Sequence, residues 1–355
     1  MNNKNVLEEI RLLINSPSIC TDSVFDLLYK HKCLYLLSRV TNNSERCSVY
    51  LATNQMIQEF RYNNCKKIFD HLNNSMPYAV IKGAALSNSI YGKPFYRVSG
   101  DIDILVSREN TNKIAEILAE NGFQQGRVVN EEITPSSRED IIYHRLNTHQ
   151  MASFQKETDF LLSPFVAVDV NFDVTWGEEK KKINLEDFLI HTESTSIYNV
   201  TVKKLSPIYE FISMCMHHYK DMNSIYLLYR NGFRLYEFSD IYFYLIHKNI
   251  DPNSLKEAGR QFDVIQYMYY CIYYTNELFP DQRLKRYLDI LCSPKGMDLL
   301  NCFGLSEEER HIWQISFLDR VFATNFKEQF LKHLTDKDLK KIKANTKYMA
   351  GATTI

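Results

Sequence analysis

The spacing of hydrophobic residues changes twice along the chain, and this change constrains the fold more than any other feature. In residues 1–75, apolar side chains recur every three or four positions, which is the spacing of amphipathic helices. Short runs in which apolar and polar side chains alternate, as in strands, occur between residues 78 and 176. Helical spacing returns after Pro207. We therefore predict an α+β protein, with a sheet in the middle of the chain and helices on both sides.

The same changes of pattern predict three domains. The first boundary falls at Met76-Pro77, because proline disfavours helical backbone in the residue before it. We predict a polar connector at the lysine run 180–182 and in residues 191–204, and we assign no element to residues 124–148. The predicted domains are an N-terminal helical segment (1–75), a core that contains the sheet (76–205) and a helical C-terminal domain (206–355).

Composition excludes several classes of protein. Glycine and proline number 11 and 9 among 355 residues, which is well below their usual share of roughly 12%. This scarcity of turn-forming residues favours helices and argues against a sandwich or a propeller. Lysine and arginine (42) nearly balance aspartate and glutamate (43), so no global basic excess indicates a nucleic-acid-binding protein.

Eight cysteines are scattered along the chain, and no two of them form a C-x-x-C pair. That usage is typical of reduced thiols and argues against a disulfide framework or a zinc site. The N-terminal residues carry acidic side chains early and predict an amphipathic helix instead of a signal peptide. The longest uncharged aromatic stretch, residues 264–276, is too short and too rich in tyrosine to span a bilayer. We therefore expect a cytoplasmic protein that does not associate with membranes.

The segment 81–106 contains the pattern that carries chemistry. In an extended strand, Asp101 and Asp103 point to one face, while Ile102 and Ile104 point to the other. Two carboxylates side by side repel each other unless a cation lies between them. Hard divalent cations such as Mg²⁺ prefer oxygen ligands of this kind. The pattern therefore predicts a metal site at Asp101 and Asp103.

A third carboxylate is available on a later strand. Residues 149–157 and 165–176 predict two further strands of the sheet. Asp169, Asn171 and Asp173 share one face of the second of these strands. Asp169 is central in the strand, whereas Asp173 lies toward its end. We therefore predict Asp169 as the third ligand.

The longer string around the two aspartates resembles a known family. It runs from Lys82-Gly83 through Arg97 to Gly100-Asp101-Ile102-Asp103, with Asp169 on a later strand. This string is similar to the bacterial family of uncharacterised nucleotidyltransferases, within the superfamily of DNA polymerase β-like nucleotidyltransferases.

The resemblance covers residues 78–176, with a weaker echo in residues 206–245. It implies that residues 76–205 form a polymerase-β-like nucleotidyltransferase core, which is a mixed sheet with flanking helices. It also implies that the C-terminal half is a helical domain.

The resemblance further implies an enzyme that transfers a nucleoside monophosphate from an NTP such as ATP to a hydroxyl group. Two Mg²⁺ ions, or Mn²⁺ in their place, would be bound by Asp101, Asp103 and Asp169. The phosphate groups would be contacted by four residues: Lys82, Gly83, Ala84 and Arg97. Ala84 stands where relatives often carry a serine, so only the backbone can serve at that position.

Several alternatives stay open. The missing hydroxyl at Ala84, and Asn171 where relatives frequently carry a histidine, leave room for a non-catalytic module that binds a nucleotide or a partner. A toxin-like nucleotidyltransferase that acts on tRNA or protein is a further alternative. The acceptor is open among small molecules, peptides and tRNA. Adjacent His217 and His218 on a helix cannot both face one site, so we predict a structural role or exposure to solvent for them instead of ligation. We expect Asp240 to orient a helix.

Overall fold

The computed structural model describes residues 3–176 and 183–349. Contacts within the chain divide it into two compact units. The helical unit comprises the chain up to Leu51 together with Met214–Thr346, and the sheet unit comprises Ala52–Ser213 together with the chain from Lys347. This division reflects contacts and does not test which parts of the chain fold independently. The three predicted domains therefore stay a prediction. The lysine run 180–182 lies outside the described residues.

The sheet unit contains one mixed sheet of eight strands in the order β4-β3-β5-β6-β2-β1-β8-β7. Strand β2 runs parallel to β6 and β1 runs parallel to β8, while the other neighbours are antiparallel. The prediction of an α+β protein is thereby confirmed. The strands are β1 (Ala79–Ile81), β2 (Ile102–Leu105), β3 (Gln124–Val129), β4 (Glu132–Pro135), β5 (Phe154–Glu157), β6 (Phe165–Asn171), β7 (Thr192–Ile197) and β8 (Val200–Leu205).

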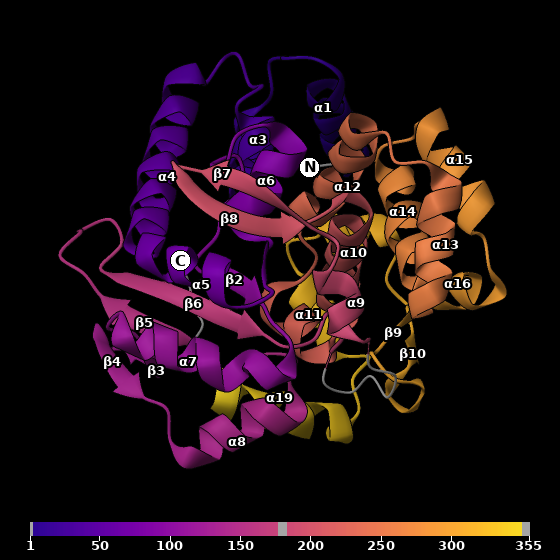
Figure 1. Cartoon of the computed structure of the whole chain (residues 1–355). Helices are drawn as coiled ribbons and strands as arrows, with labels where there is room; N and C mark the ends of the chain where they lie inside the picture. The colour runs from indigo at the N-terminus through magenta and orange to yellow at the C-terminus, as the bar shows by residue number, and fades with distance from the viewer. Residues whose placement is uncertain (1–2, 177–182, 350–355) are drawn as a thin grey trace. The chain divides into compact units, whose positions relative to one another are not determined.

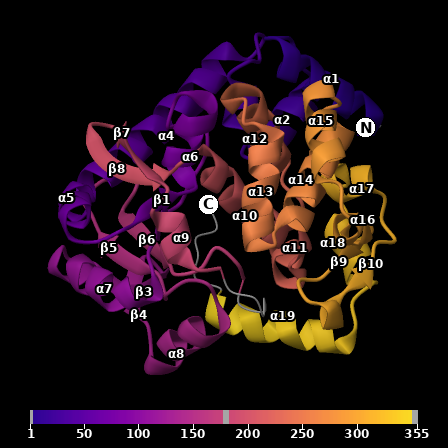
Figure 2. The ribbon, with the colours of Figure 1, turned by 45° about the vertical axis from the view of Figure 1, so that its right-hand side comes forward.

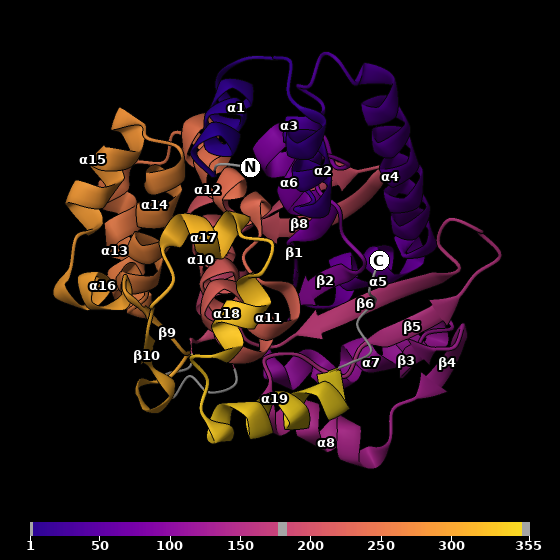
Figure 3. The ribbon, with the colours of Figure 1, turned by 180° about the vertical axis from the view of Figure 1, so that it is seen from behind.

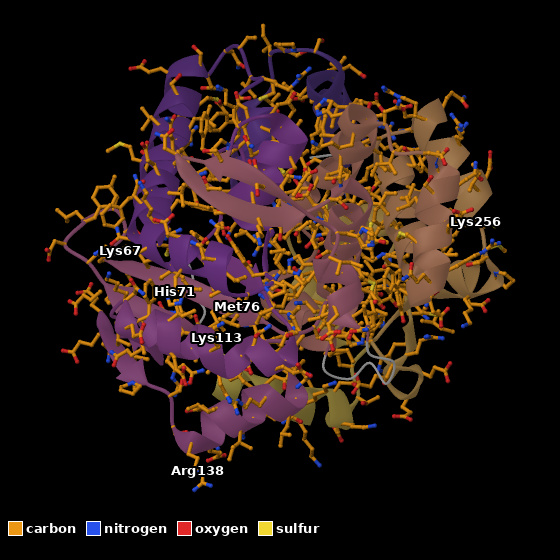
Figure 4. All side chains as sticks on the ribbon, viewed as in Figure 1. Lys67, His71, Met76, Lys113, Arg138 and Lys256 are labelled. Atoms are coloured by element: carbon orange, nitrogen blue, oxygen red, sulfur yellow. The ribbon has the colours of Figure 1, made fainter. Side chains whose placement is uncertain are left out.

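Two helices, α5 (Lys66–Ser75) and α7 (Thr111–Glu120), pack on one face of this sheet (Figure 1). Ile102 and Ile104 of β2 belong to the same buried cluster as these helices. In Figure 4, Lys113 of α7 lies near Met76, the residue that follows α5, and its Nζ donates to the carbonyl of Ser75 at 2.7 Å. Because side chains alternate along a strand, the residues between the isoleucines point to the opposite face of the sheet.

Further helices complete the sheet unit. They are the part of α4 (Ser44–Asn64) from Ala52 onward, α6 (Gly83–Tyr91), the short 3₁₀ turn η1 (Arg108–Asn110), α8 (Arg138–Asn147), α9 (Leu185–Leu189) and the start of α10 (Pro207–Asn223). A capping box at Ser137 and Asp140 begins α8, because each side chain binds the backbone N–H of the other residue.

The predicted polar connector at residues 191–204 is wrong, because this segment forms the hairpin of β7 and β8. Strand β7 is the last strand of the sheet, and most of its side chains are exposed or half-buried. Its sequence is therefore polar, as edge strands often are. Residues 124–148, to which no element was assigned, contain β3, β4 and α8.

The helical unit consists of helices and a small two-stranded sheet, and it includes α4 up to Leu51 and α10 from Met214. Helices α12, α14 and α15 pack side by side, with α13 against α14 and α15 (Figure 2). None of the described helices combines the length and the apolar run that a membrane span requires. The elements are α1 (Asn3–Asn15), α2 (Asp22–Lys30), α3 (Leu34–Leu37), α11 (Ile225–Asn231), α12 (Leu235–Lys248), α13 (Pro252–Phe262), α14 (Ile265–Leu278), α15 (Gln282–Leu291), α16 (Pro294–Leu299), β9 (Cys302–Phe303), η2 (Glu307–Glu309), β10 (His311–Ile312), α17 (Phe317–Phe322), α18 (Phe326–Leu331) and α19 (Asp336–Met349).

Helix α17 belongs to the helical unit (Figure 3). Its Arg320 is buried within a cage of aromatic rings. Its guanidinium carbon lies 4.7–5.7 Å from the ring centroids of Phe233, Tyr274, Trp313 and Phe317. Its Nη2 lies 3.4 Å from the Tyr274 hydroxyl, and its buried Nε and Nη1 have no hydrogen-bond partner among the described residues. The negative faces of the rings therefore replace a carboxylate as the partner of this cation.

We expect Arg320→Lys to destabilise the protein more than Arg320→Met. An ammonium is more strongly hydrated than a guanidinium and stacks poorly on rings, so its burial costs more, while methionine removes the buried charge and keeps the apolar contacts. Urea unfolding measures the difference, which we expect to be about 2 kcal/mol. Lys327→Met serves as the control, because Lys327 is exposed and lies over a single ring, that of Tyr229. A methionine variant that is less stable than the lysine variant contradicts this account.

Candidate active site

The three predicted carboxylates lie together on the face of the sheet opposite α5 and α7. Strands β2 and β6 are parallel neighbours, and their register pairs Asp103 directly with Asp169. Asp101 immediately precedes β2. Asp103 and Asp169 are 6% and 8% exposed. The alternation that predicted a shared face for these residues is therefore matched by the register of the two strands.

Burial and neighbouring negative charge raise the pKa of two of the carboxylates, Asp101 and Asp169. Burial, followed by the charge of Asp103, raises the pKa of Asp101. Burial, followed by the charges of Asp101 and Asp103, raises the pKa of Asp169 to about 7. Burial and mutual repulsion thus favour the protonated forms of Asp101 and Asp169 when no cation is bound.

Asp103 has two partners in the sheet unit. The Lys82 Nζ lies 2.9 Å from its Oδ1, and the Asn171 Nδ2 donates to the same oxygen at 3.1 Å. Asn171 is fully buried. The residue whose role the sequence left open therefore holds the Asp103 carboxylate in place.

Asp169 is only partly satisfied. The Gln150 Nε2 donates to its Oδ2 at 3.3 Å, and the Ser153 hydroxyl lies close enough to favour the ionised form. Its Oδ1 is buried and accepts no hydrogen bond of normal length from the described residues. A buried carboxylate oxygen without a donor is costly unless another group binds it.

A divalent cation fits this chemistry. Hard cations bind carboxylate oxygens, and such an ion would neutralise the charge that raises the pKa of Asp101 and Asp169. Among the described residues, no group of three or more aspartate, glutamate, histidine or cysteine side chains is placed so that it could hold a metal ion. The donor atoms therefore suit a cation by their chemistry and not by their spacing in this structure, where the Lys82 ammonium is the counter-ion of Asp103.

The predicted phosphate-binding residues Lys82, Gly83 and Ala84 lie at the turn from β1 into α6. Gly83 begins α6, as expected, and has a φ of +48°. A Cβ on Gly83 would lie 3.1 Å from the Ser99 Oγ. Ala84 is buried in the first turn, so it offers backbone groups alone. Arg97 lies four residues before Asp101 with its side chain buried.

Asp173 and the two histidines are engaged elsewhere. The Asp173 Oδ1 accepts hydrogen bonds from the backbone N–H (2.9 Å) and hydroxyl (2.7 Å) of Thr175. In the helical unit, the His218 Nε2 lies 3.6 Å from the Asp240 Oδ2, and the His217 Nε2 lies 3.3 Å from the Asp221 Oδ2.

Sequence reasoning missed the residues that support the carboxylates. Gln150 touches Asp169, and Ser99 donates to the Asp101 Oδ1 at 3.2 Å. Gln58 and Arg61 of α4 bind the carbonyl of Ser99 at 2.9 and 2.5 Å. The only signal in the sequence was the presence of polar side chains on a helical face, which is ordinary for a surface helix.

Lys82 has a backbone conformation that side chains rarely adopt, with φ +61° and ψ −158°. A non-glycine residue in this region costs of order 1–3 kcal/mol. We therefore expect Lys82→Gly to be more stable than Lys82→Met by about this amount, although both variants lose the ion pair with Asp103. Thermal unfolding of the two variants measures the difference. Equal stabilities would show that the Lys82 backbone carries no strain.

These observations define an α+β protein with a cluster of three carboxylates beside a glycine turn. The chain belongs to the family described as uncharacterised nucleotidyltransferase, whose sequence model matches residues 22–280. Among curated proteins, no sequence matches the chain. In solved structures, it is similar to an antigenic nucleotidyltransferase-like protein from Paracoccidioides brasiliensis, with 15% identity and a TM-score of 0.32 over 55% of this chain and 76% of that one.

Proposed function

We propose that this protein is a divalent-metal-dependent nucleotidyltransferase with a polymerase-β-like core. It transfers a nucleoside monophosphate from an NTP to a hydroxyl group of an acceptor. The observation that supports this proposal is the register of β2 and β6, which pairs Asp103 with Asp169 beside Asp101 and leaves the Asp169 Oδ1 without a donor in the described residues. The family match to residues 22–280 supports the same class of reaction.

Asp101, Asp103 and Asp169 would hold two Mg²⁺ ions, or Mn²⁺ in their place. When bound, such ions neutralise the triphosphate and lower the pKa of an attacking hydroxyl. Asn171, which donates to the Asp103 Oδ1, would orient this carboxylate toward the metal. Asp169 helps to activate the acceptor hydroxyl.

The turn between β1 and α6 would bind the phosphate groups. Backbone N–H groups at Gly83 and Ala84 lie at the positive end of the α6 dipole, which favours anions. The Lys82 ammonium and the Arg97 guanidinium would pair with phosphate oxygens. In the reaction, the acceptor oxygen bonds to the α-phosphorus while the bond to pyrophosphate breaks.

Calorimetric titration tests the proposal without knowledge of the acceptor. ATP, GTP, CTP and UTP are each added with and without Mg²⁺ to the wild type and to Asp101→Ala/Asp103→Ala. We expect metal-dependent binding of at least one NTP, its loss in the double variant, and its retention in Asp70→Asn, a control at an exposed position of α5. A wild type that binds no NTP contradicts the donor site. Tight binding without turnover on any acceptor favours the non-catalytic module.

A further inference from the structure

We propose that three side chains of α4, Asn54, Gln58 and Arg61, form a clamp that positions Asp101 and so sets the affinity of the site for its divalent cation. This inference rests on the proposed function. The three residues are spaced by four and three positions, so they lie on one face of the helix. All three are buried, although they are polar or charged.

The clamp binds alternate carbonyl groups of the loop that leads to Asp101. The Asn54 Nδ2 donates to the carbonyls of Phe95 at 2.8 Å and Arg97 at 3.3 Å. The carbonyl of Ser99 accepts from the Gln58 Nε2 and the Arg61 Nη1 at 2.9 and 2.5 Å. The last turns before Asp101 are therefore held by side chains of a helix some forty residues earlier in the chain.

Ser99 contacts both Asp101 and the turn at Gly83, so it links the clamp to both parts of the candidate active site. Its Oγ lies 2.7 Å from the carbonyl oxygen of Asp101 and 3.2 Å from the Asp101 Oδ1. The same atom would lie 3.1 Å from a Cβ at Gly83, so Ser99 also packs against the turn proposed to bind phosphate. Any shift of the Ser99 carbonyl consequently moves a metal ligand and the phosphate turn together.

Arg61 adds charge to the clamp. Its Nε donates to the Ser163 Oγ at 3.0 Å, which ties the clamp to the segment before β6. Burial lowers the pKa of Arg61, and the charge of Asp101 opposes this effect. Burial of a cation that is bonded only to neutral groups lowers the free energy of unfolding. An apolar residue of similar volume would usually give a fold of equal or greater stability. The guanidinium differs from an apolar residue in its two donors, which hold the Ser99 carbonyl and the Ser163 hydroxyl at the same time.

Two variants and two matched controls test the clamp. Arg61→Met removes the charge and both donors, and Gln58→Met removes one donor. Gln55→Met, at an exposed position three residues earlier on the same helix, and Arg46→Met, at an exposed end of α4, control for the substitutions. Mn²⁺ affinity is measured by electron paramagnetic resonance, and hydrogen exchange reports on the amides of residues 95–101.

We expect Mn²⁺ affinity to fall about 10–100-fold in Arg61→Met and about tenfold in Gln58→Met, the range found when groups that orient metal ligands are removed. Exchange should rise in residues 95–101 and stay unchanged in β6. Arg61→Lys, which keeps the charge, should recover part of the affinity, a result that a merely structural role does not predict.

Unchanged Mn²⁺ affinity in a folded Gln58→Met or Arg61→Met variant overturns the clamp. The same conclusion follows if both controls lose as much affinity as the variants. Failure of the proposed function is distinguishable, because it shows as absent Mn²⁺ binding in the wild type itself. Should Arg61→Met fail to fold, Gln58→Met and Arg61→Lys still decide the outcome.

Discussion

Asp169→Asn is expected to stabilise the metal-free protein while abolishing its metal-dependent NTP binding. The substitution keeps the shape of the side chain and removes one of three mutually repelling carboxylates. It also removes the charge from the buried Oδ1, which accepts no hydrogen bond of normal length from the described residues. The substitution should therefore raise the free energy of unfolding while it removes NTP binding, as expected where like charges are held together to bind a ligand.

The stabilisation depends on pH, and its sign follows from the direction of the pKa shift. Burial, with the charges of Asp101 and Asp103, raises the pKa of Asp169 to about 7 in the folded protein, whereas in the unfolded chain its pKa has the ordinary value of about 4. Between these values the folded state binds more protons than the unfolded state, so the free energy of unfolding of the wild type falls as pH rises. The variant lacks this group, and its advantage should grow from pH 5 to pH 8.

Thermal unfolding at pH 5 and pH 8, with and without Mg²⁺, measures these effects. Without metal at pH 8, we expect the Tm of Asp169→Asn to exceed that of the wild type by about 4 °C. Mg²⁺ should raise the Tm of the wild type at pH 8, less so at pH 5, where protons compete for the ligands, and should leave the variant unchanged. Asp70→Asn, exposed on α5, should behave as the wild type. A metal-free variant that is less stable than the wild type at pH 8 contradicts the account.

The carboxylate cluster could be predicted because it depends on alternation along two central strands. The apolar residues of β2 and β6 are buried against α5 and α7, which fixes the opposite face for Asp103 and Asp169. The edge of the sheet gave no such signal. The turns of the β3–β4 and β7–β8 hairpins, Asn130-Glu131 and Tyr198-Asn199, have positive φ without any glycine. Sequence reasoning looks for glycine in such turns, so neither hairpin was predicted.

The supporting residues could not be predicted for a different reason. Arg61 and Gln58 read as the polar face of an amphipathic helix, since nothing in a sequence says which loop a polar side chain will meet. Lys82 was expected to contact phosphate, which stays a prediction, and the structure pairs its ammonium with Asp103. Tertiary contacts between segments far apart in the chain decide such roles, and alternation within a segment does not.

Gly83→Ala is expected to lower the affinity for the NTP. Gly92→Ala, the same substitution at the other end of α6, should leave that affinity unchanged. Gly83 and Gly92 flank this helix and have φ values of +48° and +72°. A side chain at either position therefore costs about 1 kcal/mol of backbone strain. A Cβ at Gly92 would meet nothing within 4 Å, whereas a Cβ at Gly83 would press on Ser99 at 3.1 Å.

Comparison of the two variants separates the effect of backbone strain, which both share, from the effect of moving Ser99. Both variants should lose similar amounts of thermal stability. Only Gly83→Ala should push Ser99, and with it the carbonyl and carboxylate of Asp101 that the Ser99 hydroxyl binds. We expect NTP affinity to fall at least about tenfold in Gly83→Ala, equivalent to about 1.4 kcal/mol, and to stay unchanged in Gly92→Ala. Calorimetry in the presence of Mg²⁺ measures both. Equal affinities in the two variants would mean that the turn at Gly83 does not bind the nucleotide.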